Sequence, residues 1–170
     1  MPFASIPLGK TTFQITTSVG RCVQTYDLRK GLNLVFLSRP ETPELITATC
    51  AWKDRIFAAW GRDEPGGEQG IWIFKRGGKV GDLEIPAQSN EPVRQILCFG
   101  SWIIGCRTSR IEVWKSATYE HYTTLTLQRS QSGGLSDLIS GPVCNVPTFL
   151  NKLFVGRQDG SVEIWNVSTG

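Results

Sequence analysis

The chain has 170 residues, a formal net charge of +3 and 40% hydrophobic residues, enough for a core of ordinary size. Its 18 Gly, 9 Pro and 6 Trp are typical of short strands joined by turns. No long stretch combines helical periodicity with caps, so the sequence predicts an all-β fold. The mild positive charge does not by itself indicate a nucleic-acid-binding protein.

The sequence gives no sign of membrane insertion, secretion or a cofactor. The first ten residues lack a charged start followed by an apolar run, so we expect no signal peptide. No segment approaches the ~20 apolar residues of a membrane-spanning helix, so we expect a soluble protein with no membrane partner. The 5 Cys form no C-x-x-C pair, which favours buried free thiols over zinc or disulfides. Gly9-Lys10-Thr11 lacks the earlier glycine of a phosphate loop, so we expect no nucleotide, cofactor or small-molecule substrate.

Short apolar segments bounded by turns predict four groups of strands. The first group has Thr12–Thr17, a turn at Ser18–Arg21, Cys22–Asp27 and Asn33–Leu37, with a weak strand near Ala4–Leu8. The second has Leu45–Ala51, Arg55–Trp60, Ile71–Lys75 and Val80–Ile85. The third has Val93–Phe99, Trp102–Cys106, Ile111–Trp114 and His121–Leu127. The fourth has Leu138–Cys144, Leu153–Gly156 and Ser161–Val167, and no outer strand.

The four groups repeat at similar intervals along the sequence. The third strand of each ends in an aromatic residue, at Tyr26, Phe74, Trp114 and Trp165, with spacings of 48, 40 and 51 residues. These spacings lie near the ~40–45-residue period of WD-repeat propeller blades. The sequence therefore predicts a WD-repeat β-propeller fragment over 1–170, with blades near 3–37, 45–85, 93–127 and 138–167.

Four blades rarely close a ring, and an open arc would leave apolar blade faces bare. We therefore expect about four blades of a larger ring, whose remainder lies outside this chain. Two polar insertions, Arg62–Gly70 and Arg129–Gly134, are expected to be surface loops.

The fourth repeat carries the strongest WD signature. Asp159-Gly160 predicts a primed hairpin turn, because both residue types tolerate positive φ. Asp159 stands six residues before Trp165, the spacing at which a turn aspartate accepts buried donors linked to the indole. The equivalent positions are Gly20, Glu68 and Thr108, so only the fourth repeat keeps this pair.

Arginine occurs between the second and third strands of every repeat. These residues are Arg21, Arg62, Arg107 with Arg110, and Arg157. The opposite turns carry Arg29, Lys30, Lys75, Arg76, Lys79 and Lys115. Two interpretations stay open: ordinary solvated turn residues, or a face that binds acidic partners or RNA phosphates.

No arrangement of residues predicts an enzyme. His121 is the only histidine and has no triad or metal partners in the sequence, so we expect a half-exposed strand residue. The clustered carboxylates Asp63, Glu64 and Glu68 fall on a predicted flexible loop, which is poorly suited to acid–base chemistry.

Several longer stretches carry a family resemblance. They are Gly9–Asp27, Leu32–Phe36, Ala51–Ala59, Phe74–Gly77, Thr148–Leu153 and Trp165–Val167. In this order they resemble the amino-terminal propeller of the WD-repeat subunit of the UTP-B complex, the family of human WD-repeat protein thirty-six. The segments Gly61–Gly70 and Arg129–Gly141 depart from the resemblance.

The resemblance implies a non-catalytic scaffold subunit of the nucleolar small-subunit processome, associated with a box C/D snoRNP and needed for 18S pre-rRNA processing. The implied partners are other UTP-B and processome proteins, with pre-rRNA or snoRNA contact. The alternative is a generic WD-repeat protein–protein interaction adaptor. A propeller enzyme would need convergent carboxylates or metal ligands, which the sequence does not offer.

Overall fold

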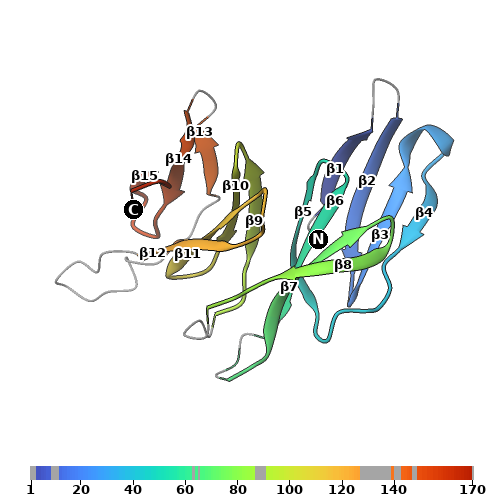
Figure 1. The fold of residues 1–170 in the computed structure, drawn as a ribbon, viewed down its shortest axis with the longest axis horizontal. Coiled ribbons are helices and arrows are strands. Elements are labelled where there is room, and N and C mark those ends of the chain that lie inside the picture. Colours follow the sequence, from blue (N-terminus) through green and yellow to red (C-terminus); the bar gives the residue numbers. More distant parts are fainter. Residues whose placement is uncertain are drawn as a thin grey trace. The chain divides into compact units, whose positions relative to one another are not determined.

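The protein is all-β, as predicted. The computed structural model describes residues 3–8, 12–62, 64, 66–86, 91–126, 139, 143–146 and 149–169. The described strands form four antiparallel sheets of consecutive strands (Figure 1). The chain divides into two compact units, Met1–Ile96 and Leu97–Gly170. One short 3-10 turn, η1 (Leu28–Lys30), follows the side-chain cap supplied by Asp27.

The first unit contains two four-stranded sheets. Sheet 1 consists of β1 (Phe3–Leu8), β2 (Thr12–Val19), β3 (Cys22–Asp27) and β4 (Asn33–Leu37). Sheet 2 consists of β5 (Ile46–Trp52), β6 (Arg55–Gly61), β7 (Gln69–Lys75) and β8 (Gly78–Leu83). The strand predicted near Ala4–Leu8 is confirmed as β1.

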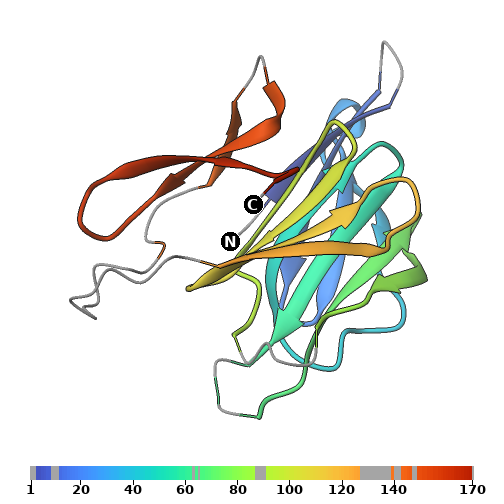
Figure 2. The same cartoon turned by 60° about the vertical axis from the view of Figure 1, so that its left-hand side comes forward.

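The second unit contains sheets 3 and 4 (Figure 2). Sheet 3 consists of β9 (Gln95–Phe99), β10 (Trp102–Cys106), β11 (Arg110–Lys115) and β12 (His121–Thr126). Sheet 4 consists, within the described residues, of β13 (Cys144–Val146), β14 (Phe149–Gly156) and β15 (Val162–Asn166).

The predicted strand Leu138–Cys144 lies mostly outside the described residues. The observed strand β13 begins at Cys144, and Ile139 makes only an isolated bridge with Arg157. Most of the intervening residues, like the predicted loop Arg129–Gly134, lie outside the described residues.

Two turns differ from the sequence-based expectation. Arg76 (φ 49°) and Gly77 (φ 82°) form a two-residue turn with both central φ angles positive, so β8 begins at Gly78 and not at Val80. In sheet 4, Gly160 donates to Arg157 O at 3.1 Å, and the Arg157 amide donates to Ser161 O at 2.9 Å. Gly160 has a positive φ (85°), whereas Asp159 is not among the positive-φ residues, so the primed two-residue turn predicted for Asp159-Gly160 is wrong.

The core of the first unit lies between sheets 1 and 2. Val23 from β3 packs with Ile56, Ala58 and Phe74 from sheet 2. The start of the connection between the sheets bonds to both of them: Ser38 donates to Val23 O at 2.8 Å, and Arg39 donates to Gly77 O at 2.7 Å. The core of the second unit joins sheets 3 and 4 through Phe99, Ile104, Cys106, Ile111, Val113, Leu125, Val143, Leu153, Val155 and Val167.

Replacing Gly77 with alanine should unfold the protein more readily. The added Cβ would meet Leu37 O at 2.8 Å, and φ is already +82°. We expect a loss of about 2–4 kcal/mol in free energy of unfolding. Gly20→Ala is the matched control, since Gly20 has φ +60° but no atom within 4 Å of the added Cβ; its expected cost is about 1 kcal/mol. Equal losses in a denaturant titration would contradict the close packing at Gly77.

Candidate functional site

In each sheet, one equivalent position of the third strand carries a side chain on which the neighbouring contacts centre. It lies two residues before the aromatic residue near the end of the third strand, and it is occupied by Gln24, Trp72, Glu112 and Glu163. The aromatic residues themselves differ in burial. Phe74 and Trp114 are 0% exposed, whereas Tyr26 and Trp165 are partly buried.

In sheet 3 this position holds a buried carboxylate. Glu112 is 0% exposed, and its Oε2 accepts a hydrogen bond from Thr124 Oγ1 at 2.5 Å and lies 2.9 Å from His121 Nε2. Its Oε1 lies 3.4 Å from Nε of Arg107, whose side chain is also fully buried. The His121 ring meets Trp114 edge-on at 5.7 Å. A buried charge is tolerated only when paired and hydrogen-bonded, so this network is structural.

Sequence reasoning missed this network. His121 was expected to be a half-exposed strand residue; its side chain is 23% exposed and its ring bonds to Glu112. The available signal was the Glu-x-Trp pattern of Glu112-Val113-Trp114, repeated as Glu163-Ile164-Trp165.

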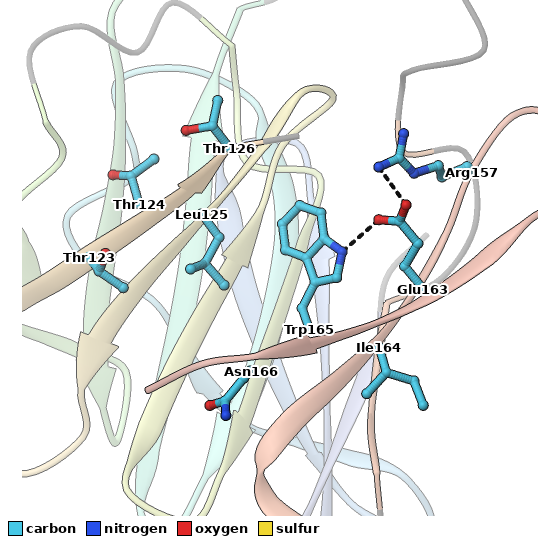
Figure 3. A pocket seen from close by; sticks show the side chains of 9 residues that line it. All are labelled: Thr123, Thr124, Leu125, Thr126, Arg157, Glu163, Ile164, Trp165 and Asn166. Carbon is cyan, nitrogen blue, oxygen red and sulfur yellow. Dashed lines mark hydrogen bonds and ion pairs between the residues drawn. The ribbon is translucent and has the colours of Figure 1, made fainter. Parts of the chain in front are cut away.

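In sheet 4 the same position forms a more exposed chain of interactions. Arg157 pairs with Glu163 Oε1 at 2.7 Å, and Trp165 Nε1 donates to Glu163 Oε2 at 2.7 Å (Figure 3). Burial raises the pKa of Glu163, but the hydrogen bonds from Arg157 and Trp165 outweigh it and hold this pKa below its ordinary value. The three side chains line a groove of about 470 Å³, whose other wall is Thr123–Thr126 of β12.

The predicted link between Asp159 and Trp165 is wrong. Asp159 is exposed, and its Oδ1 accepts from the backbone and hydroxyl of Ser161, at 2.8 and 2.6 Å. These bonds hold the pKa of Asp159 low and order the turn. The indole of Trp165 bonds instead to Glu163, because this carboxylate lies on the same strand and the same face.

Two of the candidate arginines, Arg21 and Arg62, bond to the segment between sheets 1 and 2. Arg21 Nε donates to Thr42 O at 2.6 Å, and Thr42 Oγ1 donates to Arg21 O at 3.0 Å. Arg62 pairs with Glu44 at 2.9 Å while 59% of its side chain stays exposed. Both arginines therefore have a structural partner within the chain.

The arginines between second and third strands differ in what they offer a partner. Arg107 is 2% exposed and faces Glu112, so its place on a partner-binding face is wrong. Arg110 is half-buried, and the Arg157 side chain is only 11% exposed. Arg21 and Arg62 are exposed, yet Glu41, Glu44, Glu64 and Glu68 lie on neighbouring connections. Binding of a partner by the accessible members stays a prediction.

Metal and thiol chemistry receive little support from the described part of the chain. No group of three or more His, Cys, Asp or Glu there could hold a metal ion. All five cysteines are free thiols, but only Cys106 is buried, and burial raises its pKa to about 12. The expectation of buried thiols holds for Cys106 and is wrong for Cys144, which is exposed. None of the described helical segments is long and apolar enough to span a membrane.

Breaking the buried pair in sheet 3 should destabilise the protein far more than breaking its counterpart in sheet 4. Glu112→Gln removes the buried carboxylate that faces Arg107, and we expect a loss of about 3–5 kcal/mol in free energy of unfolding. Glu163→Gln removes a carboxylate whose side chain is 38% exposed, with an expected cost below about 1 kcal/mol. Equal losses in free energy of unfolding for the two variants, measured by denaturant titration, would contradict the claim that burial makes the loss of Glu112 more costly.

The contribution of Glu163 should depend on pH. Its pKa in the folded protein lies below its ordinary value of 4.5, so its stabilising effect is present above that value and lost as pH falls through the folded-state pKa. The stability difference between the protein and its Glu163→Gln variant should therefore shrink on acidification. A constant difference between neutral and acidic pH in urea titrations would contradict the assignment.

Comparisons with known proteins agree with the predicted family. The chain is 34% identical over 160 residues to "U3 small nucleolar RNA-associated protein 21 homolog" of Schizosaccharomyces pombe, covering 92% of this chain and 16% of that protein. It is 33% identical over 177 residues to "U3 small nucleolar RNA-associated protein 21" of Saccharomyces cerevisiae, covering 100% and 17%. For human "WD repeat-containing protein 36" the identity is 27% over 162 residues, covering 94% and 16%. The chain thus spans about one sixth of these relatives.

The fold also matches a solved β structure. BamB from Moraxella catarrhalis aligns with a TM-score of 0.61 at 16% identity, over 97% of this chain and 49% of that chain. This likeness, the four antiparallel sheets and the family match confirm the predicted propeller fragment. Residues 15–170 match the family described as the WDR36/Utp21 first beta-propeller, and the chain belongs to this family.

Proposed function

We propose that the chain is part of a non-catalytic scaffold subunit of the nucleolar small-subunit processome, acting within UTP-B in 18S pre-rRNA processing. The observation that carries the proposal is 33–34% identity, over nearly the whole chain, to two yeast proteins named as U3 small nucleolar RNA-associated. The described architecture supports it, because its charged groups stabilise sheets and turns and do not converge on a reaction centre. The proposed partners are processome proteins, and the proposed location is the nucleolus.

The four sheets are proposed to be part of a larger ring. On sheet 1, Phe13, Val19 and Leu34 share one face and are 44%, 45% and 51% exposed. On sheet 4, Val162 and Ile164 are 66% and 61% exposed. Apolar faces of this kind favour cover by further blades. A fourth strand beside β15 would lie over the groove lined by Glu163–Asn166 and Thr123–Thr126.

Direct RNA or protein contact is proposed for the accessible arginines of the first unit, Arg21 and Arg62. The guanidinium of Arg62 is exposed although one edge pairs with Glu44. A planar guanidinium can bind a carboxylate or phosphate with its remaining donors.

Affinity purification of the tagged full-length protein tests the function. We expect U3 small nucleolar RNA and small-subunit precursors to be enriched, and depletion of the protein to lower 18S rRNA relative to 25S or 28S rRNA. Recovery of an unrelated set of proteins without U3 RNA would contradict the processome role and favour an interaction adaptor.

The arginine contact is tested in the same purification with Arg21→Glu and Arg62→Glu combined. We expect less partner recovery and a weaker dependence of binding on salt, because charge-assisted contacts are lost. Lys30→Glu combined with Lys53→Glu is the control for total charge. Equal effects of both double variants would assign the change to charge alone, and unchanged recovery would remove the proposed contact.

A further inference from the structure

A pocket between sheets 1 and 2 is lined by none of the exposed apolar residues or arginines on which the proposed function rests. It has a volume of about 360 Å³ and belongs entirely to the first unit. Ile56 and Phe36 form apolar parts of its lining, and Gln14 and Thr25 add polar groups. Asp54, Lys75 and Arg76 complete it from the two hairpin turns at one end of sheet 2. A volume of this size suits an entering side chain or small ligand group.

The polar lining of the pocket contains an amide that is open to an entering group. Gln14 is 9% exposed as a whole residue and lines the pocket. Its side-chain amide is not among the buried polar atoms of the described residues that lack a partner, so it can donate a hydrogen bond to a group that enters from solvent. The neighbouring Thr25, 2% exposed, adds a hydroxyl that can donate or accept.

Among the charged side chains that line this pocket, one cation is left to bind an anion. Lys75 is engaged with Asp54 at 2.9 Å, and Asp54 also pairs with Arg55 at 2.7 Å. Arg76 is exposed and has no ion pair or hydrogen bond with the described residues. Its positive φ of 49° belongs to the two-residue turn that it forms with Gly77.

We propose that this pocket binds one carboxylate side chain of an acidic segment in a partner polypeptide. The guanidinium of Arg76 would hold the carboxylate in a two-point contact, the Gln14 amide would donate to it, and the methylene groups would lie against Phe36 and Ile56. Asp54 opposes any anion at this site, but the two basic side chains that pair with it offset its charge. An RNA strand fits less well than one carboxylate, because its successive phosphates would meet one uncompensated cation, Arg76. The pocket belongs to the chain itself, so the proposal does not depend on processome membership.

Saturation-transfer NMR on the full-length protein tests the proposal with defined probes. The probes are a blocked Gly-Gly-Glu-Gly-Gly peptide, its Gly-Gly-Gln-Gly-Gly counterpart and a short oligouridylate. We expect the glutamate peptide to bind and the glutamine peptide to bind about tenfold or more weakly, because the charge-assisted contact is lost.

The key variant is Arg76→Asn. Asparagine before glycine is favoured in this type of turn, so the variant should be at least as stable as the parent while losing the guanidinium. We expect about a tenfold or greater loss of affinity for the glutamate peptide. Lys53→Asn is the matched control, since Lys53 also has a positive φ (55°) in a turn of sheet 2 but does not line the pocket; its affinity should be unchanged. Gln14→Leu should weaken binding as well.

Several outcomes would overturn the proposal. They are no binding of the glutamate peptide, equal binding of both peptides, or equal losses from Arg76→Asn and Lys53→Asn. If the oligouridylate alone binds in an Arg76-dependent manner, the pocket is an RNA site and not a carboxylate site. Loss of U3 RNA from purified particles with intact peptide binding would reject the proposed function but leave the pocket in place.

Discussion

The fold depends on burying both faces of the central strands of sheets 2 and 3. Residues Ile56–Gly61 of β6 are all buried, and Ile103–Cys106 of β10 and Ile111–Trp114 of β11 follow the same rule. A strand with both faces covered cannot alternate apolar and polar residues, so the polar groups in it need partners inside. This constraint explains why a charged side chain such as Glu112 occurs in the core together with charged and polar partners, here Arg107, His121 and Thr124.

At one equivalent position, the third strands carry different side chains, and each side chain is packed or paired in a different way. In sheet 2, Trp72 packs edge-on against Trp60 at 6.0 Å and next to Phe74 at 6.2 Å. Sheet 3 uses a buried ionic network around Glu112, and sheet 4 a half-exposed pair around Glu163. Divergent repeats can therefore keep one backbone while losing the Asp-to-Trp link typical of WD repeats. Each of these side-chain arrangements needs a neighbouring surface of matching shape and charge, so each repeat becomes specific for its neighbours.

Sequence patterns predicted the strands well and the side-chain partners poorly. Cys22–Asp27, Asn33–Leu37 and Trp102–Cys106 were placed at their observed bounds, because apolar runs and glycine turns act locally. The partner of Arg107 depends on which residues face each other across strands, and this requires the register. The partner of Trp165 lies two residues earlier on the same strand, at Glu163, so here the signal was present in the sequence. The pocket around Gln14 was not predictable, since its residues come from segments as distant as 14 and 76.

The most direct measurement of the account is hydrogen–deuterium exchange of the full-length protein, read at peptides that cover β15 (Val162–Asn166) and the bare face of sheet 1. If these sheets belong to a larger ring, β15 should exchange as slowly as β11, because a fourth strand and a further blade cover it. Fast exchange at β15, with slow exchange at β11, would show that sheet 4 ends in solvent and would contradict the account.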